Sequence, residues 1–238
     1  MNPTHKLLGA AFFGFASLVA TSHAQSDATT SASGATSTTA PIAPPDEKTS
    51  DAWVLGRTYL ELDASLEKFN TTSQSATGAA PGLGVNLPLA DSLDYGFQYG
   101  YEHAANSAFK LNDNTAETGL TLYDKFIGFA PFVTADVGYA WQRSSNTSAP
   151  SRFDHALYDV AAGVEVPVSK TASLRVWAAH DASFRKPNEN DWTYNVGAHS
   201  WITSVLGTFV GVGWKSGYLG SHDSVAYTVG LRFALDSE

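Results

Sequence analysis

Apolar residues alternate with polar or small residues along most of the chain beyond position 52. The last such stretch covers residues 225–235, where every odd position is apolar and every even position is small or polar. A repeat of two residues places all the apolar side chains on one face of a β-strand. The pattern therefore predicts a strand with one apolar face at the end of this sequence.

Nine further stretches show the same alternation. They cover residues 53–67, 83–89, 93–103, 117–123, 133–142, 156–166, 174–182, 192–199 and 208–215. Each is near the length that a tilted strand needs to cross a bilayer. The seventh stretch is the least regular, because Trp177 falls on its polar face. Ten strands are therefore expected, with eight as the alternative.

The connections between these stretches alternate in kind. Short connections are expected at 90–92, 127–130, 169–171 and 203–206, and longer, more polar connections at 68–82, 104–115, 144–154, 185–190 and 217–223. Short periplasmic turns and longer outer loops are typical of a transmembrane, antiparallel, up-and-down β-barrel. An even number of strands places both ends of the barrel chain on the periplasmic side.

The polar face of the predicted strands carries charges that a lumen would enclose. These residues are Arg57, Glu61, Asp63, Asp136, Asp159, Glu165, Arg175, Lys215 and Arg232. An unpaired buried charge is costly, so we expect the charges to pair across the interior and to fill it. The same residues could instead line a narrow path that favours cations, since carboxylates are in excess.

The apolar face ends in large aromatic residues near the longer connections. They are Trp141, Tyr158, Trp192 and Trp214, which we expect to form an aromatic girdle at the membrane interface. Glycine recurs on the polar face, where it leaves room in a crowded lumen. Both features disfavour the alternative of a soluble lipocalin-like barrel, in which the apolar face would point inward.

The first residues predict export. Lys6 precedes an apolar run at 7–20, and small Ser22 and Ala24 occupy the positions that a signal peptidase recognises, so residues 1–24 are expected to be a signal peptide. Residues 25–50 are rich in Ser, Thr, Ala and Pro, and we expect them to be a disordered periplasmic tail. The barrel domain then covers residues 51–238.

Composition excludes several classes of protein. The formal net charge of −9 disfavours binding to nucleic acid. No run of 18 apolar residues predicts a membrane helix. The sequence has no cysteine, which suits a chain that crosses an oxidising periplasm unfolded.

No arrangement of residues predicts catalysis. His180 with Ser183, and His199 with Ser200, would lie on opposite sides of their strands, so neither pair is expected to act as nucleophile and base. Zinc-binding spacings, a phosphate loop and a dinucleotide fingerprint are absent from the sequence. We therefore expect no enzymatic activity, no metal and no cofactor.

The terminal strand matches the signal that the outer-membrane assembly machinery recognises, polar-x-Gly-x-x-hydrophobic-x-hydrophobic. Thr228, Gly230, Phe233 and Leu235 fill its four positions. From 52 to 235 the chain resembles the small outer-membrane β-barrel proteins related to the transmembrane domain of outer-membrane protein A and to the opacity-type adhesins. The resemblance implies residence in the Gram-negative outer membrane, with lipid, the assembly machinery and periplasmic chaperones as partners.

Two functions are compatible with these expectations. The first is a structural or surface-interaction protein whose outer loops contact an extracellular ligand and whose lumen is filled or very narrow. The second is a small, cation-favouring porin. An outer-membrane enzyme and a soluble binding protein fit the pattern less well.

Overall fold

The computed structural model describes residues 52–71, 75–105, 109–146, 150–217 and 222–235. The signal peptide predicted for 1–24 and the tail predicted for 25–50 lie outside the described residues. No helix within the described ranges is long and apolar enough to cross a membrane.

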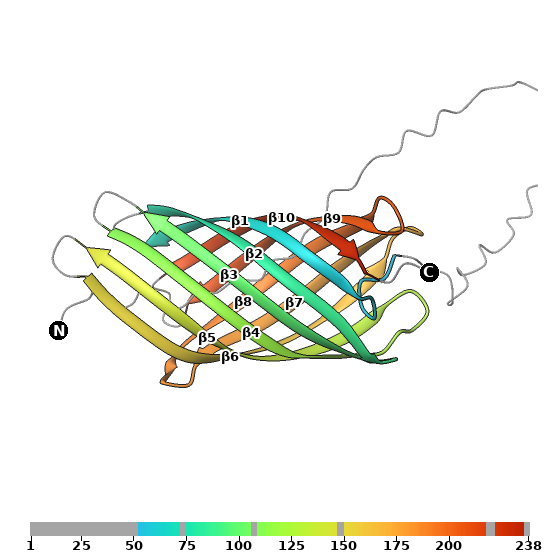
Figure 1. Ribbon diagram of the computed structural model, residues 1–238, viewed down its shortest axis with the longest axis horizontal. Coiled ribbons are helices and arrows are strands. Elements are labelled where there is room, and N and C mark those ends of the chain that lie inside the picture. Colours follow the sequence, from blue (N-terminus) through green and yellow to red (C-terminus); the bar gives the residue numbers. More distant parts are fainter. Residues whose placement is uncertain (1–51, 72–74, 106–108, 147–149, 218–221, 236–238) are drawn as a thin grey trace, which may run out of the picture.

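Ten antiparallel strands form a closed barrel (Figure 1). The strands are β1 (Tyr59–Thr71), β2 (Ser75–Ala90), β3 (Leu93–Ala105), β4 (Phe109–Tyr123), β5 (Ala130–Asn146), β6 (Pro150–Pro167), β7 (Ala172–Ser183), β8 (Lys186–Trp201), β9 (Leu206–Gly217) and β10 (His222–Ala234). Each strand pairs with the next one, and β10 pairs with β1, where Leu231 lies opposite Leu62. The expected fold and ten strands are confirmed, and the eight-strand alternative is wrong.

The apolar face of every strand points outward. Aliphatic side chains from around the barrel are between 44 and 60 % exposed. Examples are Leu62, Leu66, Val137, Val160, Val196 and Val229. A surface this apolar is suited to lipid rather than to water. The soluble lipocalin-like alternative requires the opposite orientation and does not fit.

The two ends of the barrel are joined by different connections. At the end where β1 begins and β10 ends, which we call the turn end, the connections are residues 91–92, 124–129, 168–171 and 202–205. At the other end, the loop end, they are residues 72–74, 106–108, 147–149, 184–185 and 218–221.

The prediction of longer loops at the loop end is wrong. The stretch 68–82, for example, is divided between β1 and β2, and β5 and β6 reach 17 and 18 residues. The residues expected to form loops are polar, which is why their alternation is lost. Strand pairing is nevertheless maintained by backbone hydrogen bonds, which do not depend on apolar side chains.

The first strand begins at Tyr59, six residues later than the alternation indicates. Residues 52–58, which we call the inserted segment, turn into the lumen instead. Gly56 has a φ of 78°, a conformation that L residues rarely adopt and that breaks the extended path. Val54 was expected to face lipid, but it is 1 % exposed inside the barrel.

Candidate functional site

The inserted segment lies inside the lumen at the turn end. The backbone N–H groups of Val54 and Leu55 donate to the two carboxylate oxygens of Glu165, at 2.8 and 3.3 Å. The N–H of Gly56 donates to Asp94 Oδ2 at 2.9 Å. Two inward carboxylates on β6 and β3 therefore hold three consecutive amides of the segment across the barrel.

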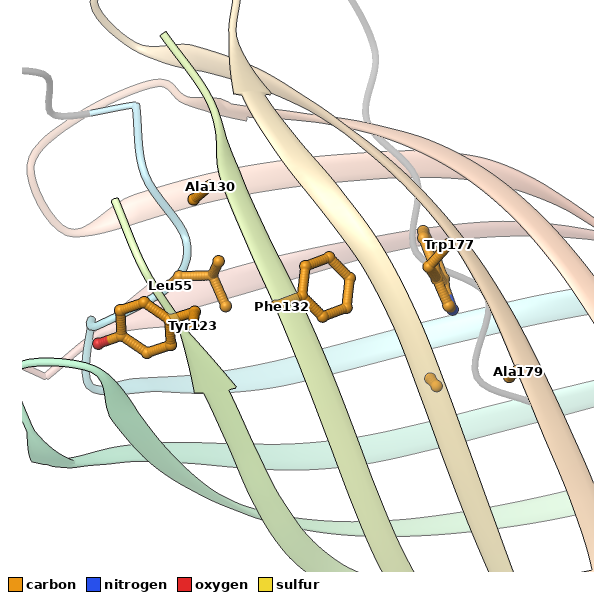
Figure 2. Close-up of a cluster of buried hydrophobic side chains, with 7 residues drawn as sticks. Leu55, Tyr123, Ala130, Phe132, Trp177 and Ala179 are labelled. Atoms are coloured by element: carbon orange, nitrogen blue, oxygen red, sulfur yellow. The ribbon is translucent and has the colours of Figure 1, made fainter. Parts of the chain in front are cut away.

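Side chains of the inserted segment pack against the barrel interior. Leu55 belongs to a buried apolar cluster with Tyr123, Phe132 and Trp177 (Figure 2). Trp53 packs against the same cluster. Val54 packs in a second cluster with Tyr59 and Trp201. These contacts fill the turn end of the lumen with apolar side chains.

Two cations lie over aromatic rings at the same end of the lumen. The guanidinium of Arg57 lies 4.6 Å from the ring centroid of Trp201, and the ammonium of Lys125 lies 5.8 Å from that of Trp53. Both distances allow a cation–π interaction. Lys125 belongs to the 124–129 connection outside the strands, and its partial burial lowers its pKa.

Ion pairs lie next to the inserted segment, on its side toward the loop end. Arg232 Nε donates to Glu61 Oε2 at 2.5 Å, and Arg232 Nη1 donates to His199 Nδ1 at 3.0 Å. The same guanidinium lies over the rings of Tyr59 and Phe209, at 5.0 and 4.5 Å. Arg232 is completely buried, so a charge held this way is both paired and enclosed.

Glu165 connects the second ion pair to the inserted segment. It is completely buried, accepts a hydrogen bond from Ser173 Oγ at 2.7 Å, and lies 3.9 Å from Arg175 Nε. The guanidinium of Arg175 lies over the ring of Phe132 at 4.4 Å. The charges of this layer are therefore neutralised within the protein.

The middle of the lumen has a different character. Asp136, Asp159, Asp181 and Asp191 lie opposite one another in register on four neighbouring strands, β5 to β8. The first three line a cavity of about 140 Å³ together with Asp94, Gln98 and Glu117. This cavity lies between the inserted segment and the loop end.

Carboxylates continue toward the loop end. Glu67, Glu102 and Asp113 are buried there, and Lys215 forms an ion pair with Asp191 at 2.8 Å. Carboxylates outnumber cations among the buried side chains. The part of the lumen toward the loop end therefore has a strongly acidic character.

The structure brings together only part of the predicted charge network. Glu61 with Arg232 and Glu165 with Arg175 form pairs, whereas Asp136 and Asp159 line the acidic cavity. Asp63 lies opposite Gly230 and Gly82. Lys215 pairs with a residue that was not predicted, Asp191. Arg57 was expected on the inner face of a strand but lies on the inserted segment instead.

Several lumen residues were left out of the predicted charge network. They are Glu67, Asp94, Glu102, Asp113, Glu117, Asp181, Asp191 and His199. Most occupy the polar positions of alternating stretches, so a systematic extension of that alternation would have found them. The role of Asp94 in holding Gly56 has no signal in the sequence, because it depends on the turn of the inserted segment.

The predicted girdle residues lie on the outward face near the loop end. Trp141, Trp192 and Trp214 are 40, 48 and 45 % exposed, and Tyr158 packs its ring 5.0 Å from that of Phe184. Their role as an aromatic girdle at the membrane interface stays a prediction.

The residues of the predicted assembly signal have different surroundings. Thr228 Oγ1 lies 2.7 Å from Ser65 Oγ inside the lumen, and a side chain at Gly230 would collide with the ring of Phe209. Leu235 is exposed beyond the end of β10, and Phe233 points outward within it. Recognition of these residues by the assembly machinery stays a prediction.

Within the described part of the chain, His180 and Ser183 lie on opposite faces of β7. His180 points outward, with its ring 4.9 Å from that of Trp192, whereas Ser183 is buried on the opposite face. Among the described residues, no group of three or more His, Cys, Asp or Glu side chains could hold a metal ion.

Neither a protein-family model nor a curated protein matches this sequence. Solved structures do match its fold. The translocator domain of the autotransporter NalP from Neisseria meningitidis is 6 % identical, covers 74 % of this chain and 88 % of its own, and has a TM-score of 0.50.

Two smaller barrels are also similar. Neisserial surface protein A is 15 % identical with a TM-score of 0.41, and the match covers 74 % of this chain and 96 % of that one. The N-terminal β-barrel domain of Pseudomonas aeruginosa OprF is 11 % identical with a TM-score of 0.40, over 74 % and 98 % of the chains. The closed antiparallel barrel of this chain is thus similar in fold to the NalP translocator domain.

Proposed function

We propose that this protein is an integral barrel of the Gram-negative outer membrane with a structural or surface-interaction role and a lumen closed at its turn end. The observation that carries the proposal is the inserted segment, whose amides are bound by Glu165 and Asp94 across the barrel. An open diffusion channel would need this region free for water and solutes. Lipid contacts the outward apolar face, and the assembly machinery and periplasmic chaperones deliver the chain.

The layer of ion pairs next to the inserted segment narrows the same end of the lumen. Arg232 and Arg175 each lie between a carboxylate and an aromatic ring, so their charges are neutralised without mobile ions. A ten-strand barrel is only slightly wider than one that side chains can fill. Two successive layers of filling side chains leave no wide path at this level.

A small cation-favouring channel is the second candidate, and one observation favours it. The cavity of about 140 Å³ is lined by carboxylates that exceed the nearby cations. Such a chamber attracts cations and excludes anions. In this reading the inserted segment would act as a removable obstruction.

Planar-bilayer conductance of the purified mature protein separates the two functions. We expect the wild-type barrel to show no conductance. We expect a variant lacking residues 52–58 to show cation-selective conductance through the acidic cavity. Stable channels in the wild type whose selectivity changes on Asp136→Asn would overturn the closed barrel. A deletion variant that folds but stays silent would remove the obstruction mechanism.

Two measurements test the location. After fractionation of cells, the protein should be recovered with the outer membrane. In detergent, the folded protein should migrate differently on a gel before and after boiling. Recovery as a detergent-free periplasmic monomer would contradict the proposal.

A further inference from the structure

A groove lies on the outer wall of the barrel near the loop end, across β3 to β6. It has a volume of about 530 Å³, and we call it the wall groove. Its lining residues are Tyr99, Tyr101, Asn112, Asn114, Trp141, Arg143 and Arg152. None of them belongs to the lumen.

The register of the strands arranges these side chains in rows. His103, Asn112, Arg143 and Arg152 lie opposite one another on the four strands, two or three residues before the last paired residues at the loop end. The next row on this face contains an aromatic residue on β3 and another on β5, Tyr101 and Trp141. Tyr99 and Tyr139 follow in the row below, and the apolar residues Phe97 and Val137 occupy the same strands after them. The groove therefore lies at the boundary between the apolar belt and the polar end of the barrel, where lipid headgroups are found.

The row that begins with His103 contains two arginines in direct opposition. Arg143 on β5 is the register partner of Arg152 on β6, and both side chains are exposed. Like charges that face each other across a strand pair are destabilising. Asp154 compensates part of this charge, because its carboxylate lies 2.6 Å from Arg152 Nη2. An anion bound between the two guanidinium groups would compensate the rest.

The remaining lining residues provide a polar and aromatic floor. Tyr99 Oη donates to Asn114 Oδ1 at 2.7 Å, and Tyr101 Oη donates to Asn112 Oδ1 at 2.9 Å. The ring of Trp141 lies 5.1 Å from that of Tyr139. Amide and phenol groups suit sugar hydroxyls, and the rings suit the apolar faces of a sugar or the start of an acyl chain.

We propose that the wall groove binds the phosphate-bearing sugar headgroup of a membrane glycolipid. The planar forks of Arg143 and Arg152 match phosphate oxygens, and the groups below them match a sugar attached to acyl chains that continue along the apolar belt. The proposal rests on residence in the outer membrane and does not depend on whether the lumen conducts. A silent bilayer and a conducting bilayer are equally compatible with it.

Native mass spectrometry of the full chain in detergent tests this site. The probes are a bisphosphorylated disaccharide lipid, the same lipid without phosphate, phosphatidylglycerol and inorganic phosphate at equal concentration. We expect retention of the bisphosphorylated glycolipid by the wild type, at least tenfold weaker retention by Arg143→Gln/Arg152→Gln, and unchanged retention by the control Lys170→Gln at the turn end. Equal retention of the phosphate-free lipid, or displacement by inorganic phosphate, would overturn the proposal.

A second variant gives an effect of opposite sign. Asp154→Asn removes the carboxylate that competes with phosphate for Arg152, so retention of the bisphosphorylated glycolipid should rise several-fold. If the ion pair were only structural, the variant would bind the lipid no better than the wild type. The shift on boiling confirms that each variant is folded. Unchanged or weaker retention by a folded Asp154→Asn protein would also overturn the proposal.

Discussion

The two halves of the lumen are built from the same strands but differ in electrostatic character, since one is neutralised by ion pairs and the other is acidic. At the turn end, Arg232 and Arg175 each have a carboxylate partner and an aromatic neighbour, and the inserted segment covers them. In the middle, aspartates lie beside aspartates around a cavity. A β-barrel thus fixes which residues face inward, while the identity of those residues decides whether a given level is closed.

The largest effect is expected where a paired charge at the turn end loses its partner. Arg232→Met leaves Glu61 buried without its cation, and we expect a loss of about 3–5 kcal/mol in the free energy of unfolding. Urea unfolding in lipid vesicles, followed by tryptophan fluorescence, measures this change. The double variant Glu61→Gln/Arg232→Met should recover much of the loss. A double variant no more stable than the single one would show that the pair does not act as a unit.

The outward wall should be destabilised by a charge wherever it faces lipid. Val176 tests one such position. This residue is 50 % exposed on the outward face of β7, opposite Val164 and Val196. Val176→Arg should cost about 2–4 kcal/mol at a mid-membrane position. Val176→Leu is the matched control and should cost little. A Val176→Arg protein as stable as the wild type in vesicle unfolding would mean that β7 does not face lipid there.

The sequence predicts the wall of the barrel better than its ends. The alternation around Val176 and Val229 identifies ten strands and their outward faces, because a period of two depends only on which side meets lipid. It also continues through Val54 and Gly56, where the chain leaves the wall. Trp53 and Leu55 are apolar on the face expected to be polar, and they are the residues that pack inside the lumen.

The closed region was harder to predict because it depends on contacts between residues far apart in the chain. Glu165 lies 111 positions from Val54, and nothing near either residue indicates that they meet. Strand ends at the loop end were missed for a different reason. Polar side chains on both faces remove the alternation while the backbone pairing continues.

A moderate effect is expected at the turn of the inserted segment. Gly56→Ala places a side chain at a φ of 78° and 2.7 Å from the hydroxyl of Tyr123, so a loss of about 1–2 kcal/mol in unfolding free energy is expected. The control is Gly96→Ala, because a side chain there meets no atom within 4 Å. Equal losses for the two variants would contradict a specific role for Gly56.

The smallest effect is expected in the acidic half, with the opposite sign. Asp159 lies between Asp136 and Asp181 in register, so Asp159→Asn removes repulsion on both sides. We expect unfolding free energy to rise by about 0.2–1 kcal/mol. The same vesicle assay applies, with Glu61→Gln as the comparison that should destabilise. A clear loss of stability in Asp159→Asn would mean that the two halves do not differ as described.

The length of β5 and β6 has a consequence for any molecule that approaches from the loop end. A strand of 17 residues, as in β5, extends about 56 Å, or about 43 Å along the axis at a tilt near 40°. An apolar belt of about 25 Å leaves the ends of β5 and β6 to project about 15–20 Å beyond it. A molecule that approaches there meets hydrogen-bonded sheet whose shape is already set. Binding to these strand ends would cost little ordering entropy, and its specificity would follow from side chains in strand register.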